Sequence, residues 1–165
     1  MEIIVDGYNV IAFDQGLSGD LERKRNWLLQ QLSHYRERKG FSITVVFDAW
    51  KSRSIEEVAE TRHGVRVLYS RQGEKADEVI VRITRAKGSS CVIVTSDREV
   101  RRAVEKFGAT AIYATEFVDI LRSVENLGVA DMADSIESGG TKKGNPRRLS
   151  KTERKRLEMI RKLWP

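Results

Sequence analysis

The chain of 165 residues is long enough for one domain with a substantial core, and its 40% hydrophobic and 33% charged residues are typical of a soluble globular protein. No apolar run approaches the roughly 18 residues of a membrane helix. The amino terminus opens directly on an apolar segment and lacks the basic and apolar regions of a signal peptide. The single cysteine, Cys91, excludes an internal disulfide framework. We therefore expect a cytoplasmic protein with no membrane partner.

The net charge of +6 is concentrated at the carboxyl end. Residues 139–165 contain ten Lys and Arg and only two Asp and Glu, a balance of +8. The remainder of the chain therefore has a balance of −2. The basic character belongs to the tail, so an acidic partner is expected to contact that segment first.

Strand-like and helix-like segments alternate along the first 124 residues. Apolar, β-branched runs predict five strands, at 2–6, 42–47, 65–69, 90–95 and 110–114. Amphipathic periodicity predicts helices at 20–39, 76–87, 98–107 and 115–124, with a polar loop after the first strand and a short helix opened by Ser54. This alternation predicts a three-layer α/β fold, in which a parallel sheet of about five strands carries helices on both faces.

The segment 128–149 is poor in large apolar residues and contains four glycines, which is typical of a linker. Ser150 and Glu153 form a capping box that predicts a basic helix over 150–165. Leu157, Ile160 and Trp164 share one face of this helix. We therefore expect a main domain over 1–127, a linker over 128–149 and a basic carboxy-terminal helix.

An aspartate stands at the end of three predicted strands or within two residues after it: Asp6, Asp48 and Asp97. The carboxyl ends of parallel strands meet at one edge of a sheet, where open α/β sheets bind ligands. Asp77, in the first turn of helix 76–87, is expected at the same edge. Clustered carboxylates repel one another unless a proton or a hard cation lies between them, and oxygen ligands suit Mg²⁺. Four such residues favour a metal site.

Each of these residues also has a structural interpretation. Asp6 fits a turn, Asp97 or Ser96 fits a helix N-cap, Asp77 suits a helix dipole and Asp48 could cap a loop. Asn9 could orient a water molecule or a carboxylate, or it could form a loop hydrogen bond. Ser96 could likewise bind a phosphate oxygen. In the functional interpretation, a metal-bound water attacks a phosphorus atom.

The sequence resembles the YacP-like branch of the NYN domain family. The resemblance covers about residues 2–121 and lies in the blocks VDGYNVI at 5–11, VFDA at 46–49, YS at 69–70, ADE at 76–78, VTSD at 94–97 and FVDIL at 117–121. It implies a PIN-like fold, a Mg²⁺ or Mn²⁺ site and endonucleolytic cleavage of RNA, in some members on ribosome-engaged mRNA. Position by position, the acidic residues of the family fall on Asp6, Asp48, Asp77 and Asp97, with Asn9 and Ser96 as auxiliaries. The chain departs from the family pattern at Trp50 and Lys75, where a polar residue and a threonine are expected, which leaves substrate choice open.

Basic residues supply two candidate RNA contacts. Lys51, Arg53 and Lys75 lie in loops at the predicted acidic edge, where they could hold a phosphate backbone. In the tail, RNA or the ribosome is expected to contact Lys142, Lys143, Arg147, Arg148, Lys151, Arg154 and Lys155. In the alternative interpretation, these charges are solvated and the tail helix docks on the domain through its apolar face.

The leading hypothesis is therefore a metal-dependent endoribonuclease that cleaves RNA phosphodiester bonds with a metal-activated water. The alternative is a non-catalytic RNA-binding or ribosome-associated factor with the same fold. A haloacid phosphatase is disfavoured because Asp6 is not followed by a second aspartate two residues later. The sequence indicates neither the RNA target nor the oligomeric state.

Overall fold

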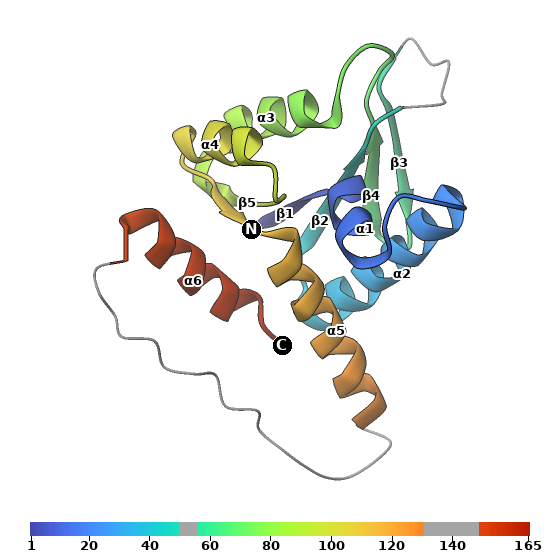
Figure 1. Ribbon diagram of the computed structural model, residues 1–165. Coiled ribbons are helices and arrows are strands. Elements are labelled where there is room, and N and C mark those ends of the chain that lie inside the picture. The colour runs from blue at the N-terminus through green and yellow to red at the C-terminus, as the bar shows by residue number, and fades with distance from the viewer. Residues whose placement is uncertain (50–55, 131–148) are drawn as a thin grey trace.

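The computed structural model describes residues 1–49, 56–130 and 149–165, and it places six strands in one sheet (Figure 1). The strands are β1 (Glu2–Asp6), β2 (Ser42–Phe47), β3 (Val58–Arg62), β4 (Val65–Tyr69), β5 (Cys91–Val94) and β6 (Thr110–Ile112). Their order in the sheet is β3-β4-β2-β1-β5-β6. All neighbouring pairs are parallel except β3 and β4, which form an antiparallel hairpin at one edge.

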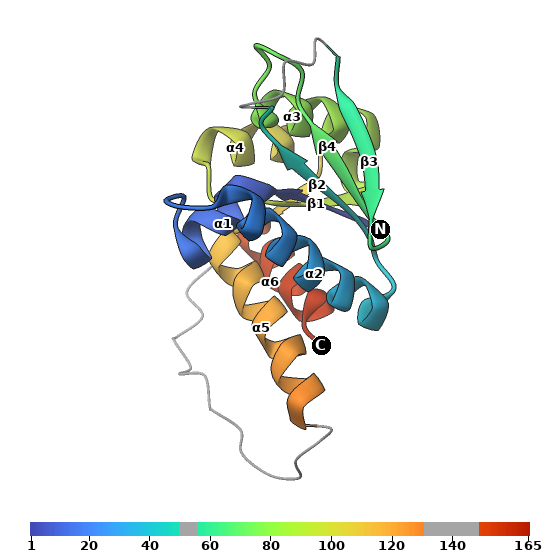
Figure 2. The same ribbon diagram turned by 90° about the vertical axis from the view of Figure 1, so that its right-hand side faces the viewer.

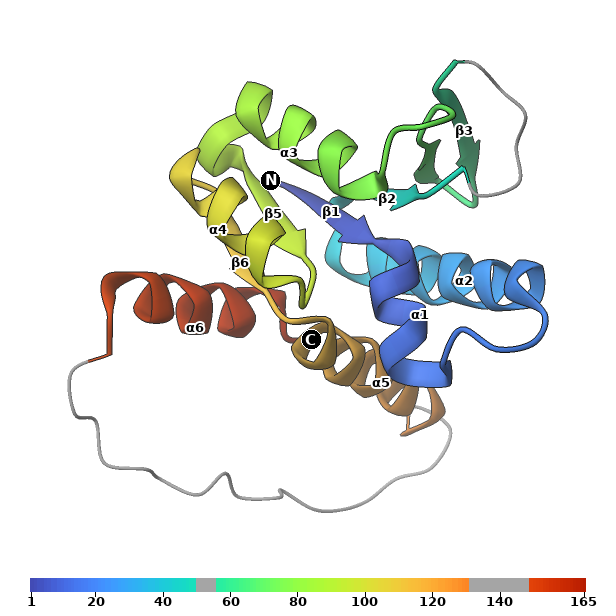
Figure 3. The ribbon, with the colours of Figure 1, turned by 45° about the horizontal axis from the view of Figure 1, so that its top comes forward.

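Helices cover both faces of the sheet, which confirms the predicted three-layer α/β fold (Figure 3). One face carries α1 (Gly7–Gln15), α2 (Leu21–Lys39), α5 (Ala114–Ala130) and α6 (Lys151–Leu163), and the other carries α3 (Ala76–Lys87) and α4 (Arg98–Lys106). A short 3₁₀ turn, η1 (Gly88–Ser90), leads into β5. Because side chains alternate along a strand, Ile3 and Val5 pack into one apolar cluster while Ile4 packs into the other. No helix in these described ranges is long and apolar enough to span a membrane.

The region after β1 differs from the predicted polar loop. The helix α1 begins immediately after the strand, with Asp6 as its N-cap. Gly7 and Asn9 have low helix propensity, so the local sequence indicates a turn. Tertiary packing stabilises a helix here instead, because Val10 and Ile11 are completely buried against the sheet.

The edge hairpin was also not predicted. The short helix expected from Ser54 falls partly outside the described residues, and the residues that follow form β3 rather than a helix. β3 and β4 are joined by His63 and Gly64, both of which have positive φ. Two consecutive residues of this kind are typical of a tight hairpin turn. At the other end of the chain, α5 continues to Ala130 and so overlaps the start of the predicted linker at residue 128.

The basic helix α6 docks on the domain beside β6, α2 and α5 (Figure 2). Its capping box is present, with Ser150 as the N-cap and Glu153 as its partner. Leu163 is completely buried, and its backbone carbonyl accepts a hydrogen bond of 2.8 Å from the Tyr35 hydroxyl. Of the three residues predicted to form the apolar face, Ile160 packs against the core, whereas Leu157 and Trp164 are exposed. The tail helix is therefore part of the folded structure.

Candidate functional site

The three central strands bring their carboxyl ends to one edge of the sheet. Asp6 is the last residue of β1, which lies in parallel register between β2 and β5. Asp48 follows β2, and its Oδ1 accepts a hydrogen bond of 2.5 Å from the backbone N–H of Ala76 at the start of α3. This bond ties the first turn of α3, and therefore Asp77, to the same edge. Asp97 lies three residues after β5.

Asp6 is the most perturbed carboxylate of the site. Its side chain is only 7% exposed, and burial raises its pKa to about 7. The negative charges of Asp77 and Asp48 contribute to this rise in pKa. Two hydrogen bonds oppose the shift, from the Asn9 backbone N–H to Oδ1 at 3.2 Å and from the Thr95 hydroxyl to Oδ2 at 3.1 Å. Near neutral pH this carboxyl group is therefore divided between its protonated and charged forms.

The pKa of Asp77 is raised as well, first by burial and then by the charges of Asp97 and Asp48. Lys75 opposes this shift. The effects on Asp6 and Asp77 together link all four carboxylates electrostatically. Mutual repulsion between carboxylates is relieved by a proton or by a bound cation.

The two auxiliary residues, Asn9 and Ser96, join the ends of β1 and β5. The side-chain oxygen of Asn9 accepts a hydrogen bond of 2.9 Å from the Ser96 backbone N–H. The Ser96 hydroxyl accepts a hydrogen bond of 3.1 Å from the backbone N–H of Ala114 at the start of α5. Asn9 thus forms the expected loop hydrogen bond, whereas Ser96 is not the N-cap of α4 but bonds the start of α5, and both bonds hold the acidic edge together.

Asp97 also has its expected structural role as the N-cap of α4. Its Oδ1 accepts hydrogen bonds from the backbone N–H groups of Glu99, at 2.7 Å, and Val100, at 3.0 Å. Both bonds use the same oxygen atom. A helix N-cap and a metal ligand are compatible roles, because a carboxylate has two oxygens.

Within the described ranges, no three acidic, histidine or cysteine side chains stand close enough to hold one metal ion among themselves. Mg²⁺ commonly uses only one or two carboxylates and completes its octahedron with water and substrate phosphate. The donors at this edge are all carboxylate oxygens, which suits Mg²⁺ or Mn²⁺ rather than Zn²⁺. The chemistry of the donor set therefore fits such an ion.

The predicted basic contacts are only partly visible. Lys75 is exposed at the N-cap position of α3, close enough to Asp77 to affect its pKa. On α6, Lys151, Arg154 and Lys155 are exposed. The remaining candidates lie outside the described residues, and they are Lys51, Arg53, Lys142, Lys143, Arg147 and Arg148.

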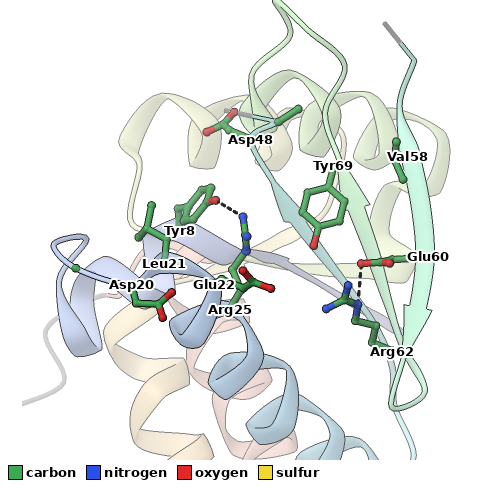
Figure 4. Close-up of a pocket in the computed structure, with 12 residues that line it drawn as sticks. Tyr8, Asp20, Leu21, Glu22, Arg25, Asp48, Val58, Glu60, Arg62 and Tyr69 are labelled. Atoms are coloured by element: carbon green, nitrogen blue, oxygen red, sulfur yellow. Dashed lines mark hydrogen bonds and ion pairs between the residues drawn. The ribbon is translucent and has the colours of Figure 1, made fainter. Parts of the chain in front are cut away.

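A cleft of about 620 Å³ adjoins Asp48 and was missed by the sequence analysis (Figure 4). Tyr8 and Arg25 line one side of it, and Tyr69 with residues of β3 lines the other. Recognising it required the β3–β4 hairpin. The local signal was weak, because residues 58–62 read VAETR without alternation of apolar and polar side chains, and only the His63–Gly64 pair that follows indicates a turn.

The α/β fold that carries this edge is of the nuclease-like, PIN-like type. Over residues 3–162 the sequence matches the YacP-like NYN domain, and the chain belongs to this family. It is 31% identical over 132 residues to the protein YacP of Bacillus subtilis (strain 168), covering 76% of this chain and 75% of that protein.

Solved structures agree with this assignment. A crystal structure of Rae1 (YacP) from Bacillus subtilis superimposes with a TM-score of 0.67 at 27% identity, over 80% of this chain and 79% of that one. A second crystal structure, of a single-residue variant of Rae1, covers 99% of this chain and 91% of that one, with a TM-score of 0.66 at 23% identity. The second match thus covers nearly the whole chain.

Proposed function

We propose that this protein is an endoribonuclease that depends on Mg²⁺ or Mn²⁺ and cleaves RNA at the acidic edge of its sheet. The observation that carries the proposal is the burial of Asp6 at the end of β1, which raises its pKa to about 7 with a contribution from the charges of Asp77 and Asp48. A buried carboxylate of this kind is costly to keep charged without a cation. Membership of a family with a nuclease-like fold supports the same conclusion.

The carboxylates of Asp6, Asp48, Asp77 and Asp97 would hold the ion, directly or through its water ligands. When bound, the ion would supply an activated water for attack on phosphorus and would neutralise the charge on the leaving oxygen. The Thr95 hydroxyl orients the Asp6 carboxylate, because it donates to Oδ2. Asn9 positions the loop after β5 through its bond with the Ser96 backbone.

The exposed basic residues suit an RNA substrate. An edge crowded with carboxylates repels a phosphate backbone at long range, so a positive surface elsewhere would raise the encounter rate. Lys151, Arg154 and Lys155 are exposed although α6 is docked, so docking of the helix and RNA contact are compatible. A cytoplasmic RNA, including a ribosome-engaged message, is the substrate class that we propose.

A second candidate function is RNA binding without cleavage. It is favoured by the lack, among the described residues, of three ligand side chains close enough to hold an ion together. In this case the acidic edge would have a structural role and no catalytic one. The basic helix α6 would then carry the function.

Cleavage assays with the full chain distinguish these functions. The protein would be incubated with mixed cellular RNA, with Mg²⁺, with Mn²⁺ or with a chelator. We expect metal-dependent cleavage that is lost in Asp6→Asn and retained in Asp119→Asn, a matched control that changes an exposed carboxylate on α5. RNA that binds but stays intact under every metal condition would favour the second candidate.

A further inference from the structure

The cleft beside Asp48 has the size of a small-molecule site. Its volume of about 620 Å³ falls within the roughly 300–1,000 Å³ typical of ligand pockets. It lies between the β3–β4 hairpin and the amino-terminal parts of α1 and α2 (Figure 4). Asp48 is the one carboxylate of the acidic edge that also lines the cleft.

The register of the hairpin directs polar and aromatic side chains into this cleft. Glu60 pairs with Val67 and Arg62 pairs with Val65 across the two strands. Side chains of cross-strand partners lie on the same face of a sheet, as do side chains two residues apart. Glu60 and Arg62 therefore share the face of Tyr69, which is the face that α1 and α2 cover.

Two tyrosine rings in the cleft are held rigidly against the core. Tyr69 stacks on the buried Phe47 with 5.9 Å between ring centroids and 26° between planes. Tyr8 meets the same ring edge-on at 5.1 Å, and its hydroxyl accepts a hydrogen bond of 3.0 Å from Arg25. Both tyrosines remain partly exposed. Rings that are already fixed lose little entropy when a flat ligand stacks on them.

The charges of the cleft favour a neutral occupant. Among the residues that the structure describes, its charged lining consists of four acidic and two basic groups, which are Asp20, Glu22, Asp48, Glu60, Arg25 and Arg62. This excess of negative charge repels a phosphate group. Glu60 and Arg62 form an ion pair of 2.9 Å, so they present an acceptor and a donor side by side. Nucleobases carry adjacent donors and acceptors along their edges and have two flat faces for stacking.

We propose that this cleft binds one unpaired nucleobase of the RNA strand that is cut. The base stacks on the tyrosine pair and its edge meets Glu60 and Arg62, while its phosphate stays outside at the acidic edge. This inference rests on the proposed function and extends it, because the cleft then determines which bond reaches the carboxylates. The substrate is single-stranded at this position, since paired bases are already stacked within their own helix.

Binding measurements with uncut RNA test the inference. In an Asp6→Asn background, fluorescence anisotropy would compare a labelled RNA octamer with an octamer of the same length in which all bases are removed. Tyr69→Ala should weaken binding of intact RNA roughly 5- to 150-fold, the loss of about one stacked base, and leave binding of abasic RNA unchanged. Tyr69→Phe keeps the ring and should bind both RNAs as the background does.

A second pair of variants changes exposed side chains and leaves the core unchanged. Arg62→Ala removes an exposed side chain and should weaken binding of intact RNA more than binding of abasic RNA. Arg66→Ala is the matched control, because Arg66 lies in the same hairpin on the opposite face of the sheet and is also exposed. It should affect both RNAs equally. Melting temperatures would confirm that each variant is folded.

Equal losses on intact and abasic RNA for both Tyr69→Ala and Arg62→Ala, or no loss for either, would overturn the inference. Because the variants are compared without cleavage, this result is separate from the proposed catalysis. Base-dependent binding in a protein that never cleaves RNA would refute the catalytic proposal and leave the base site standing. Metal-dependent cleavage by the wild type, together with unchanged RNA binding by the Tyr69 and Arg62 variants, would support the catalytic proposal and refute the base site.

Discussion

The substitution Asp6→Asn should stabilise the metal-free protein while it abolishes activity. In the folded chain the pKa of Asp6 is raised from 3.8 to about 7, because the carboxyl group is buried among other carboxylates. A raised pKa means that the folded state binds more protons than the unfolded state between these two values. The stability contributed by the protonated carboxyl group is therefore complete below pH 3.8 and is lost as the pH rises through 7.

The magnitude follows from the size of the shift. At about 1.4 kcal/mol per pKa unit, a charged Asp6 costs the metal-free fold up to about 4 kcal/mol above pH 7. Asparagine removes this charge, and it can still accept the helix-capping bond from the Asn9 backbone. For a chain of this size the gain corresponds to an increase in melting temperature of up to roughly 8–16 °C at pH 8. Between pH 7 and pH 5 the difference should shrink by about 2 kcal/mol, because the carboxyl group is only half charged at pH 7.

Thermal unfolding in the presence of a chelator, from pH 5 to pH 8, measures this effect. Asp119→Asn is the control for loss of an exposed aspartate, and it should follow the wild type at every pH. Adding Mg²⁺ or Mn²⁺ should raise the melting temperature of the wild type, since binding to the folded state stabilises it, and should affect Asp6→Asn less. If Asp6→Asn melts at or below the wild-type temperature at pH 8, or if the difference does not depend on pH, then the reasoning about the buried carboxylate is wrong.

Three further predictions concern packing and the basic helix. Gly7→Ala should destabilise the fold by about 1–3 kcal/mol in denaturant titrations, because a Cβ atom there would overlap the buried ring of Phe47; unchanged stability would show that the ring can move aside. Leu163→Ala should cost about 2–5 kcal/mol in the same assay, since this side chain is fully buried, whereas Leu157→Ala on the exposed side of α6 should cost far less; similar losses would contradict the docked position of the helix. Replacing Lys151, Arg154 and Lys155 of α6 with glutamate should leave the melting temperature nearly unchanged. The same change should weaken RNA binding and reduce the dependence of this binding on salt concentration. An unchanged salt dependence would count against the proposed contact.

Local sequence determined the central sheet and the position of its acidic edge. Apolar, β-branched runs flanked by polar residues are strong strand signals, and their alternation with amphipathic segments predicts parallel pairing. Once the strands are parallel, the residues that end them must share one edge, so Asp6 and Asp48 could be placed together in advance. The capping box at Ser150 is equally local, and it predicted the start of α6 correctly.

Other features depended on contacts between distant segments. The weak helix signal of α1 is overcome by burial of Val10 and Ile11, and the exposed strand β3 exists because it pairs with β4. The raised pKa of Asp6 results from burial and from charges brought close by two other elements.

The cleft beside Asp48 is the clearest case of tertiary control. It joins Tyr8 with Tyr69, which are far apart in the chain and meet only because both rings pack on Phe47. Neither tyrosine carries a local signal for such a site, because an aromatic residue next to a strand end is equally consistent with core packing. The sequence determined which groups could perform chemistry, through residue type and strand position. The tertiary structure decided which groups face a common space, because that depends on strand order, hairpin register and the helices that cover each face.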